Sequence, residues 1–387
     1  MSTAKTGSNS TPFSPYQKMV IPILAIVQFT VVLDFMVMAP LGDMLMKTMK
    51  LDASQFAAAV SVYAFSAGIS GLLAAGFADK FDRKKLLLFF YTGFITGTFI
   101  CAMASTYHML MVGRIVTGIF GGVLGSISFA IVADLFTFDQ RGRVMGFVQM
   151  AFAISQVGGI PVGLYLANHF GWEAPFFLIV GLSVLTGLVI IRFLRPVVAH
   201  MERKATVRPV EHLRKTVSNK SYQLPFLTTA LLSIGGFMMM PFSTPFIINN
   251  LHISQTSLPL IYVITGIGSM VTLPMIGKLS DRIGKYPTFV GGSILAIIMV
   301  LIYTNLPPIP VWELILVNMI MFAGIMSRMI PATALMTAIP AMEDRGAFMS
   351  INSSLQQVAG GIASVIAGLI IYQQPNGSLQ HFNTLGY

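Results

Sequence analysis

The chain has 387 residues, of which 55% are hydrophobic and only 10% are charged, less than half of the roughly 25% charged residues that a soluble globular protein carries. This composition and the mean hydropathy of +0.77 exclude an array of soluble domains, because only lipid accommodates so much apolar surface. The net charge of +10 does not indicate nucleic-acid binding, which needs a basic face on a soluble module, and the single cysteine, Cys101, excludes a disulfide framework or a Cys-based zinc site.

Eleven apolar stretches are long enough to cross a bilayer, since about 20 helical residues span its hydrocarbon core. They are predicted at 19–40, 55–78, 86–105, 108–134, 144–166, 174–194, 223–248, 257–279, 286–304, 311–339 and 347–372. The first residues are rich in Ser and Thr and have no apolar stretch of the kind found in signal peptides. We therefore expect residues 1–18 to be a disordered cytoplasmic tail.

The distribution of basic residues predicts the orientation of these spans. If the N-terminus is cytoplasmic and the spans alternate, Lys47 and Lys50 lie outside while Arg114 and Arg328 lie within spans, which leaves 20 of the 24 Lys and Arg residues inside. Such asymmetry is the pattern of the positive-inside rule. It accounts for the net positive charge without a polyanionic partner.

A repeat of about 200 residues divides the chain into two halves. Asp79 and Asp281 follow the second and eighth spans in similar basic loops, and Arg141 and Arg345 precede the fifth and eleventh spans in Arg-Gly pairs. A duplicated unit of six helices, with a substrate site between the copies, is a common transporter architecture. We predict an N-terminal six-helix bundle at 19–194, a cytoplasmic linker at 195–222 and a C-terminal bundle at 223–387. Only five helices are present in the second bundle, and we interpret the missing twelfth helix as a truncation of the chain.

The loops after the second and eighth spans resemble the signature loop of the major facilitator superfamily, Gly-x-x-x-Asp-(Arg/Lys)-x-Gly-x-(Arg/Lys)-(Arg/Lys). The copy from Gly277 to Lys285 matches this pattern through its lysine, whereas in the first copy Ala75 and Asp82 replace the two glycines. The resemblance covers nearly the whole chain. It implies an all-α membrane protein with two six-helix bundles related by a pseudo-two-fold axis.

Three further segments resemble the drug/proton antiporter branch of this superfamily. They are Leu33 to Pro40 in the first span, Arg114-x-x-x-Gly118 in the fourth, and Gly158 to Gly163 in the fifth, the last only loosely because Ile160 separates Gly159 from Pro161. The resemblance implies coupling of transport to protons.

Asp34 and Arg114 are the candidates for proton coupling. A carboxylate within a span costs about 3 kcal/mol on insertion scales unless it is protonated or paired, so an ionisable residue there indicates function. We expect Arg114 to lie near Asp34 across the cavity, where movement of the pair, or of substrate between them, changes the affinity of Asp34 for a proton. The alternatives are a structural Asp34 bonded to neighbours such as Thr30, and an Arg114 that extends to the outer interface.

A second group of charges is predicted to gate the transporter at the cytoplasmic face. The resemblance implies that Asp79 interacts with a helix N-terminus of the other half, as the helix dipole favours, and that Arg83 pairs with Asp134 at the end of the fourth span. Asp281 and Arg282 are the corresponding residues of the second copy. The alternative is that all these charges only satisfy the positive-inside rule.

The substrate cavity is predicted from polar residues within spans, because lipid-facing amides are disfavoured. For Arg328 the sequence leaves two positions open, the cavity or the cytoplasmic headgroups. Abundant Met and Phe suit apolar ligands but also face lipid. The cavity candidates are Gln149, Gln156, Arg328, Asn352, Gln356 and Gln357.

We therefore predict a proton-coupled secondary transporter that exports small, partly lipophilic compounds by alternating access. The alternatives are proton-coupled transport of polar metabolites and, more distantly, a membrane-embedded enzyme or a channel, since fold alone does not define function. No metal-binding or nucleophile motif is present in the sequence. We expect no cofactor beyond the proton gradient, no nucleic-acid partner, contact with membrane lipid, a monomer, and a multi-pass protein of a bacterial inner membrane.

Overall fold

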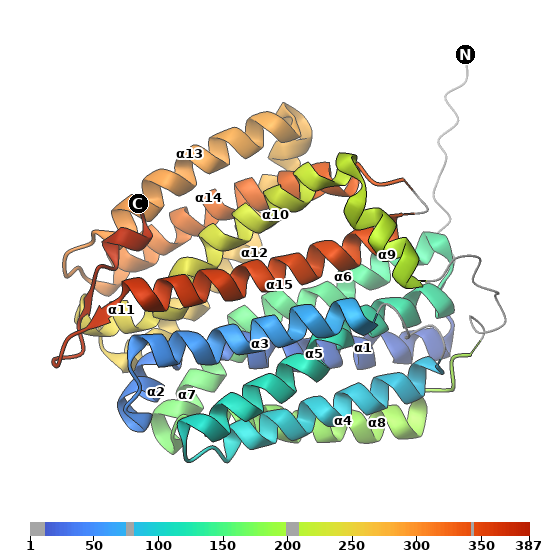
Figure 1. Cartoon of the computed structure of the whole chain (residues 1–387), viewed down its shortest axis with the longest axis horizontal. Helices are drawn as coiled ribbons and strands as arrows, with labels where there is room; N and C mark the ends of the chain where they lie inside the picture. The colour runs from blue at the N-terminus through green and yellow to red at the C-terminus, as the bar shows by residue number, and fades with distance from the viewer. Residues whose placement is uncertain (1–11, 75–80, 199–208, 342–343) are drawn as a thin grey trace.

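The computed structural model describes residues 12–74, 81–198, 209–341 and 344–387, and it is almost entirely helical (Figure 1). Within these residues, eleven helical stretches are long and apolar enough to cross a membrane. The spans run over Pro15–Val37, Ala53–Ala74, Arg83–Ala102, Tyr107–Leu135, Asp139–Phe170, Ala174–Phe193, Lys220–Asn249, Gln255–Ile283, Lys285–Thr304, Val311–Met336 and Arg345–Ile370. Every predicted span is present, with ends that differ by a few residues from those expected.

The helices that form these spans, and the short elements between them, are as follows. They are α1 (Pro15–Val37), α2 (Gly42–Met49), α3 (Ala53–Ala74), α4 (Arg83–Ala102), α5 (Tyr107–Leu135), α6 (Phe138–Ile154), the π-helical turn η2 (Ser155–Gly159), α7 (Ile160–Phe170), α8 (Ala174–Phe193), α9 (Pro209–Ser218), α10 (Lys220–Met239), α11 (Ser243–Asn249), α12 (Leu258–Ile283), α13 (Lys285–Thr304), α14 (Val311–Thr337), α15 (Arg345–Ile370), and strands β1 (Tyr372–Gln373) and β2 (Leu379–Gln380).

The spanning helices run between two ends of the bundle. The linker end carries α9 and the start of α1, and the hairpin end carries α2, α11 and the β1–β2 hairpin (Figure 1). The two strands pair antiparallel, with Tyr372 opposite Gln380. By the distribution of basic residues, the linker end is the one predicted to be cytoplasmic.

Two predicted boundaries were wrong, and capping explains both. Ser14 accepts a hydrogen bond from the backbone of Gln17, whose side chain returns one to Ser14, and Pro15 occupies the first turn, so helix begins within the predicted tail 1–18. At the other boundary, Asn219 caps α10 and starts it within the predicted linker 195–222. That linker also contains the helix α9.

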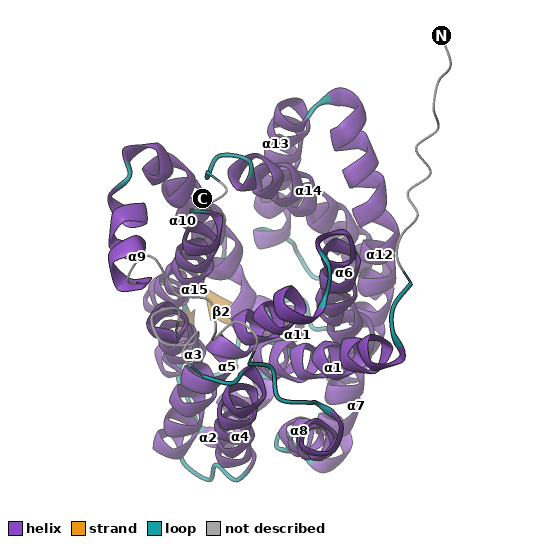
Figure 2. Ribbon diagram, turned by 90° about the vertical axis from the view of Figure 1, so that its right-hand side faces the viewer, coloured by secondary structure: helices purple, strands orange, loops and turns teal. Residues whose placement is uncertain are grey.

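Small residues allow the spanning helices to approach closely, both within and between the halves of the chain. On α5, a Cβ atom at Gly118 or Gly122 would lie only 2.5 or 2.6 Å from backbone atoms of α3. Between the halves, α3 packs along α15, where a Cβ at Gly68 would lie 3.0 Å from the carbonyl oxygen of Ser354. Viewed along the helices, α1 and α5 lie on one side of the bundle centre and α10 and α14 on the other (Figure 2).

The outward faces of the helices are apolar. Leu73, Phe89, Leu185, Leu316 and Leu369 each expose more than half of their surface. Such a belt of large hydrophobic side chains on every side of a bundle is the surface that a bilayer covers.

Candidate functional site

Asp34 and Arg114 form a buried ion pair. Nη1 of Arg114 donates to Oδ2 of Asp34 at 2.9 Å, and both side chains have no exposed surface. The hydroxyl of Thr98 on α4 lies 3.2 Å from the other carboxylate oxygen. Arg114 therefore does not extend to the outer interface. Thr30 bonds Tyr91 and the carbonyl of Val27 rather than Asp34. Asp34 is bonded instead to Thr98 and Arg114 of two neighbouring helices, and these contacts are compatible with a structural role as well as with proton coupling.

The ion pair lies nearer the hairpin end than the sequence suggests. The first span was predicted at 19–40, which places Asp34 near its middle, but α1 ends at Val37, so Asp34 occupies its last turn. Arg114 lies in the second turn of α5, which starts at that same end. The pair therefore lies between the midplane of the bundle and its hairpin end.

An aromatic series connects this ion pair to the C-terminal half. The guanidinium of Arg114 lies 4.4 Å from the ring centre of Tyr63, within the range of a cation–π contact. Tyr63 stacks on Phe35 at 5.4 Å, and Phe35 contacts Phe237 of α10 at 6.0 Å. A series of ring contacts thus joins Arg114 to α10.

The Arg114 guanidinium is only partly satisfied. Among the described residues, its Nε and Nη2 atoms are buried and have no hydrogen-bond partner. A buried donor without a partner costs about 1–3 kcal/mol. The Arg114 guanidinium therefore combines one strong contact to Asp34 with two buried donors that have no hydrogen-bond partner among the described residues.

Arg328 lies in the interior of the C-terminal half. Its Nε is buried, and its Nη2 atom lies 3.9 Å from where a Cβ of Gly235 on α10 would be. The side chain is mostly shielded, and the part of the chain that the structure describes gives it no hydrogen bond and no ion pair. Of the two positions left open by the sequence, the structure shows the one inside the bundle.

The loop residues Arg83 and Asp134 are paired at the linker end, with Nε of Arg83 3.2 Å from Oδ2 of Asp134. Their neighbour Asp82 caps α4, accepting hydrogen bonds from the backbone nitrogens of Lys84 and Val197. The loop is thereby held to the segment that follows α8. Asp79, the other predicted gating residue of this loop, lies outside the described residues.

The charged residues in the second copy of this loop are more exposed to solvent than those in the first. Among the described residues, Asp281 pairs with Lys285 alone, one turn away at 3.4 Å, and its side chain is 78% exposed. Arg282 is exposed in the last turn of α12. Gly284, which corresponds to Asp82 by the offset of 202, ends α12 with a φ of 101°.

The predicted cavity amides lie on three elements, α6, η2 and α15. Gln149 on α6 is exposed, and Gln156 is half-buried in η2. On α15, Asn352 accepts a hydrogen bond from Thr229 of α10 at 2.5 Å. Gln356 and Gln357 are half-buried on the same helix. Their assignment to a substrate cavity stays a prediction.

A polar cluster that is not apparent from the sequence joins the two halves at the hairpin end. Asp43, buried on α2, receives hydrogen bonds from Lys47 at 2.8 Å and from Asn249 of α11 at 2.5 Å. Lys47 also bonds Asn249, at 3.1 Å. The one sequence signal for this cluster is that Asp43 and Lys47, of opposite charge, lie one helical turn apart near the end of a span. The sequence contains no signal that Asn249 joins them.

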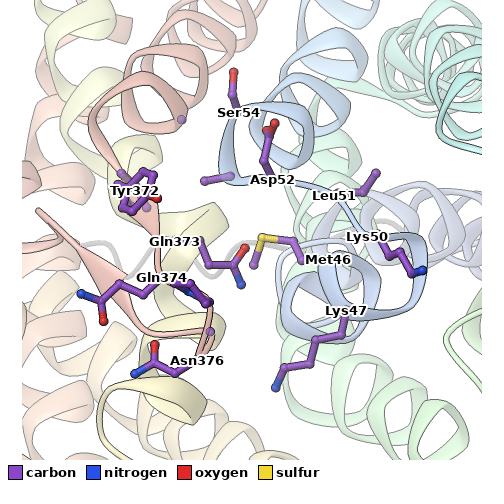
Figure 3. Close-up of a pocket in the computed structure, with 15 residues that line it drawn as sticks. Met46, Lys47, Lys50, Leu51, Asp52, Ser54, Tyr372, Gln373, Gln374 and Asn376 are labelled. Carbon is purple, nitrogen blue, oxygen red and sulfur yellow. The ribbon is translucent and has the colours of Figure 1, made fainter.

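A cavity of about 690 Å³ lies beside this cluster. Figure 3 shows its two walls, one from α2 and the start of α3, with Met46, Lys50 and Asp52, and the other from the hairpin, with Gln373 and Asn376. The cavity therefore lies between the two halves. Within the described residues, no group of three or more His, Cys, Asp or Glu side chains is placed to hold a metal ion.

Comparison with known proteins agrees with this architecture. Residues 24–364 match the family model of the Major Facilitator Superfamily. The chain is 24% identical over 361 residues to the uncharacterized MFS-type transporter YceJ of Bacillus subtilis, covering 93% of this chain and 90% of that protein. A shorter stretch of 127 residues is 32% identical to multidrug resistance protein 3 of the same organism and covers 33% of this chain and 25% of that protein.

Among solved structures, the D-xylose–proton symporter superposes with a TM-score of 0.74 at 17% identity, over 92% of this chain and 90% of that one. Such similarity shows the fold. The chain thus belongs to the major facilitator superfamily, and it is a multi-pass membrane transporter with the fold of that family.

Proposed function

We propose that this transporter is driven by protons and exports small, partly lipophilic compounds by alternating access. The observation that carries the proposal is the ion pair of Asp34 and Arg114, which has no exposed surface and a contact of 2.9 Å. An ionisable residue inside a membrane protein is costly and marks ion pathways.

Protonation of Asp34 is the proposed coupling step. A proton on the carboxylate removes its charge and releases Arg114, whose charge persists because guanidinium groups do not deprotonate in proteins. Arg114, with two buried donor atoms already unpaired, then finds partners elsewhere. Its displacement moves Tyr63, Phe35 and, across the interface, Phe237.

Alternating access requires that the two ends of the bundle open in turn. At the hairpin end, Asp43 and Lys47 of one half hold Asn249 of the other. At the linker end, the Arg83–Asp134 pair and the Asp82 contacts lie within the N-terminal half. We infer that the conformation described here is closed at the hairpin end, the predicted outer side, and that Asp79, Arg83, Asp134, Asp281 and Arg282 act when the linker end closes.

The experiment uses proteoliposomes that contain a pH dye and carry an inward proton gradient. Lipophilic anions and cations, sugars and amino acids are tested for substrate-induced proton flux in the wild type, in Asp34→Asn and in Asp139→Asn, a control that removes an exposed carboxylate at the linker end. We expect flux with a lipophilic compound, its loss in Asp34→Asn and its retention in the control.

Two results contradict parts of the proposal. Proton-coupled flux that persists in Asp34→Asn removes Asp34 from the mechanism. Flux confined to sugars or amino acids places the protein among transporters of polar metabolites and leaves the coupling proposal intact.

A further inference from the structure

We propose that Arg328 binds an acidic group of the transported compound, so that the substrates are small organic anions with an apolar body. The inference deepens the proposed function by naming its substrate class. It rests on the chain being a transporter, and it does not depend on Asp34 as the proton carrier.

The first argument is the depth of Arg328. It lies 17 residues after the start of α14 and nine before its end, which corresponds to roughly 25 Å and 13 Å at 1.5 Å per residue. Helical side chains point toward the N-terminus of their helix, here the hairpin end, so the guanidinium lies deeper still. Its neighbour Gly235 is 15 residues into α10, or roughly 22 Å from the linker end. The charge therefore lies near the middle of the bundle.

The second argument is the lack of a counter-charge. The sequence of the C-terminal half contains four acidic residues, Asp281, Glu313, Glu343 and Asp344. Three of them, Asp281, Glu313 and Asp344, lie at the ends of spans. Glu343 lies outside the described residues, and among the described ones no hydrogen bond or ion pair reaches Arg328. An arginine within a membrane protein normally pairs or lines a cavity that substrate or ions enter. Here the protein supplies the positive charge, and the negative charge is left to the ligand.

The third argument is the space beside the guanidinium. A Cβ at Gly235 would meet only Arg328, at 3.9 Å, and one at Gly236 would meet nothing within 4 Å. Most other glycines in the helix contacts of this half are crowded, as at Gly360, where a Cβ would lie 2.9 Å from the ring of Phe237. The face of α10 next to Arg328 is therefore open, with no side chain filling it.

The surroundings indicate that the rest of the ligand is apolar. One turn from Arg328 toward the linker end lies a cluster of Leu232, Ala332 and Met336 with Phe289 and Met329. Toward the hairpin end, Phe237 follows Gly236 and contacts Phe35 of the other half. A planar guanidinium binds a carboxylate or sulfonate through two parallel hydrogen bonds, and the apolar side chains accommodate the body.

This arrangement also places the ligand next to the coupling residues. Phe237 is two residues from Gly235 and ends the aromatic series that starts at Arg114. An anion seated at Arg328 therefore contacts the helix that moves when the Asp34–Arg114 pair opens.

The test compares four probes with the same ring system: naphthalene-2-sulfonate, naphthalene-2-carboxylate, neutral 2-naphthalenemethanol and a naphthylmethylammonium cation. Binding to the full chain in lipid nanodiscs is measured by titration calorimetry for the wild type, Arg328→Gln, Arg328→Lys and Arg192→Gln, whose arginine is exposed at the end of α8. We expect the two anions to bind at least tenfold more tightly than the neutral and cationic probes.

Arg328→Gln is expected to lose this preference, at least tenfold, and to bind the neutral probe as the wild type does. Arg328→Lys keeps the charge without the planar fork and is expected to retain part of the preference. Arg192→Gln should match the wild type. A second variant, Gly236→Leu, fills the open space and is expected to weaken the anions while Arg328 is intact.

An anion that binds wild type no better than the neutral probe overturns the inference, whether or not any variant folds. Equal weakening of all four probes in Arg328→Gln also overturns it, because that result indicates a structural role. If Asp34→Asn still binds the anions and its proton flux is unchanged, the proposal that Asp34 couples transport to protons is wrong, whereas the proposed substrate class is retained.

Discussion

Each half of the chain has an arginine within its membrane-spanning helices, fully buried in the N-terminal half and half-buried in the C-terminal half, and the two differ in their partners. In the N-terminal half, Arg114 is held by Asp34 at 2.9 Å and by the ring of Tyr63. In the C-terminal half, Arg328 has no hydrogen bond or ion pair from the described residues. Under the two proposals made above, this difference is a division of tasks, in which one half carries the ion that drives transport and the other leaves a charge for the substrate.

The largest expected effect follows from breaking the pair in the N-terminal half. Asp34→Ala leaves a permanent positive charge in the interior, and removing one partner of a buried ion pair costs about 3–5 kcal/mol. Arg114→Leu should cost less, because the remaining carboxylate can take up a proton and become neutral. The measurement is thermal unfolding in nanodiscs, followed by size-exclusion chromatography.

The double variant Asp34→Ala/Arg114→Leu is the control, since it leaves no charge behind. It should be more stable than Asp34→Ala and should lack proton-coupled flux. If Asp34→Ala is as stable as the wild type, Arg114 does not depend on Asp34 and the division between the halves fails.

Arg328→Leu is expected to act in the opposite direction. The variant removes a charge that has no counter-ion, so the free energy of unfolding should be unchanged or should rise by at most about 3 kcal/mol. The unfolding temperature should be unchanged or higher accordingly. The same thermal assay detects this change, and anion binding should be lost. A loss of stability as large as that of Asp34→Ala would mean that Arg328 has a structural partner and is not held free for a ligand.

The sequence predicts the spans and their number because hydropathy and helix length decide them locally. It does not predict which charges meet. Asp34 and Arg114 are 80 residues apart, and the expectation that they lie close together came from their types and depths alone. Asp43 and Asn249 are 206 residues apart at ordinary span ends, so no local signal joins them.

The two copies of the repeated loop show a further limit. The second copy keeps a glycine, Gly284, whose φ of 101° needs the freedom of that residue. In the first copy the corresponding Asp82 has a φ of −54° and caps α4 instead. A departure from a motif thus reflects a different local structure, which the motif itself cannot predict.

A smaller effect is expected at the contact that joins the halves. Asn249→Ala removes both hydrogen bonds to Asp43 and Lys47, each worth about 1 kcal/mol. The halves should then separate more often at the hairpin end. Spin labels at Lys50 and Thr256, exposed residues of the two halves, measure this distance in a Cys101→Ala background.

Asn250→Ala is the matched control. Asn250 bonds both backbone groups of Leu379 and so acts within the C-terminal half. It should leave the distance distribution unchanged. A distribution in Asn249→Ala that matches the wild type would show that the Asp43 cluster does not keep this end closed.

The smallest effect is expected where α9 contacts the C-terminal half, since these groups are partly exposed. Asp344 lies before α15 and accepts hydrogen bonds from His212 of α9 at 2.8 Å and from Tyr222 of α10 at 2.9 Å. The hydrogen bond from His212, then that from Tyr222, lowers the pKa of Asp344, and the nearby charge of Lys215 acts in the same direction.

A carboxyl group whose pKa is lower in the folded protein stabilises the fold above its ordinary value, about 3.9, and this contribution is lost as the pH falls through the lowered pKa. Exchange of the backbone amides of residues 210–218, corrected for intrinsic rates, should therefore be slow at neutral pH and accelerate only below about pH 4. In Asp344→Asn these amides should exchange faster at neutral pH, with a weaker acid dependence. Because Glu211 also lies on α9, an acid dependence identical in both proteins would assign it to Glu211 and leave α9 without the proposed anchor at Asp344.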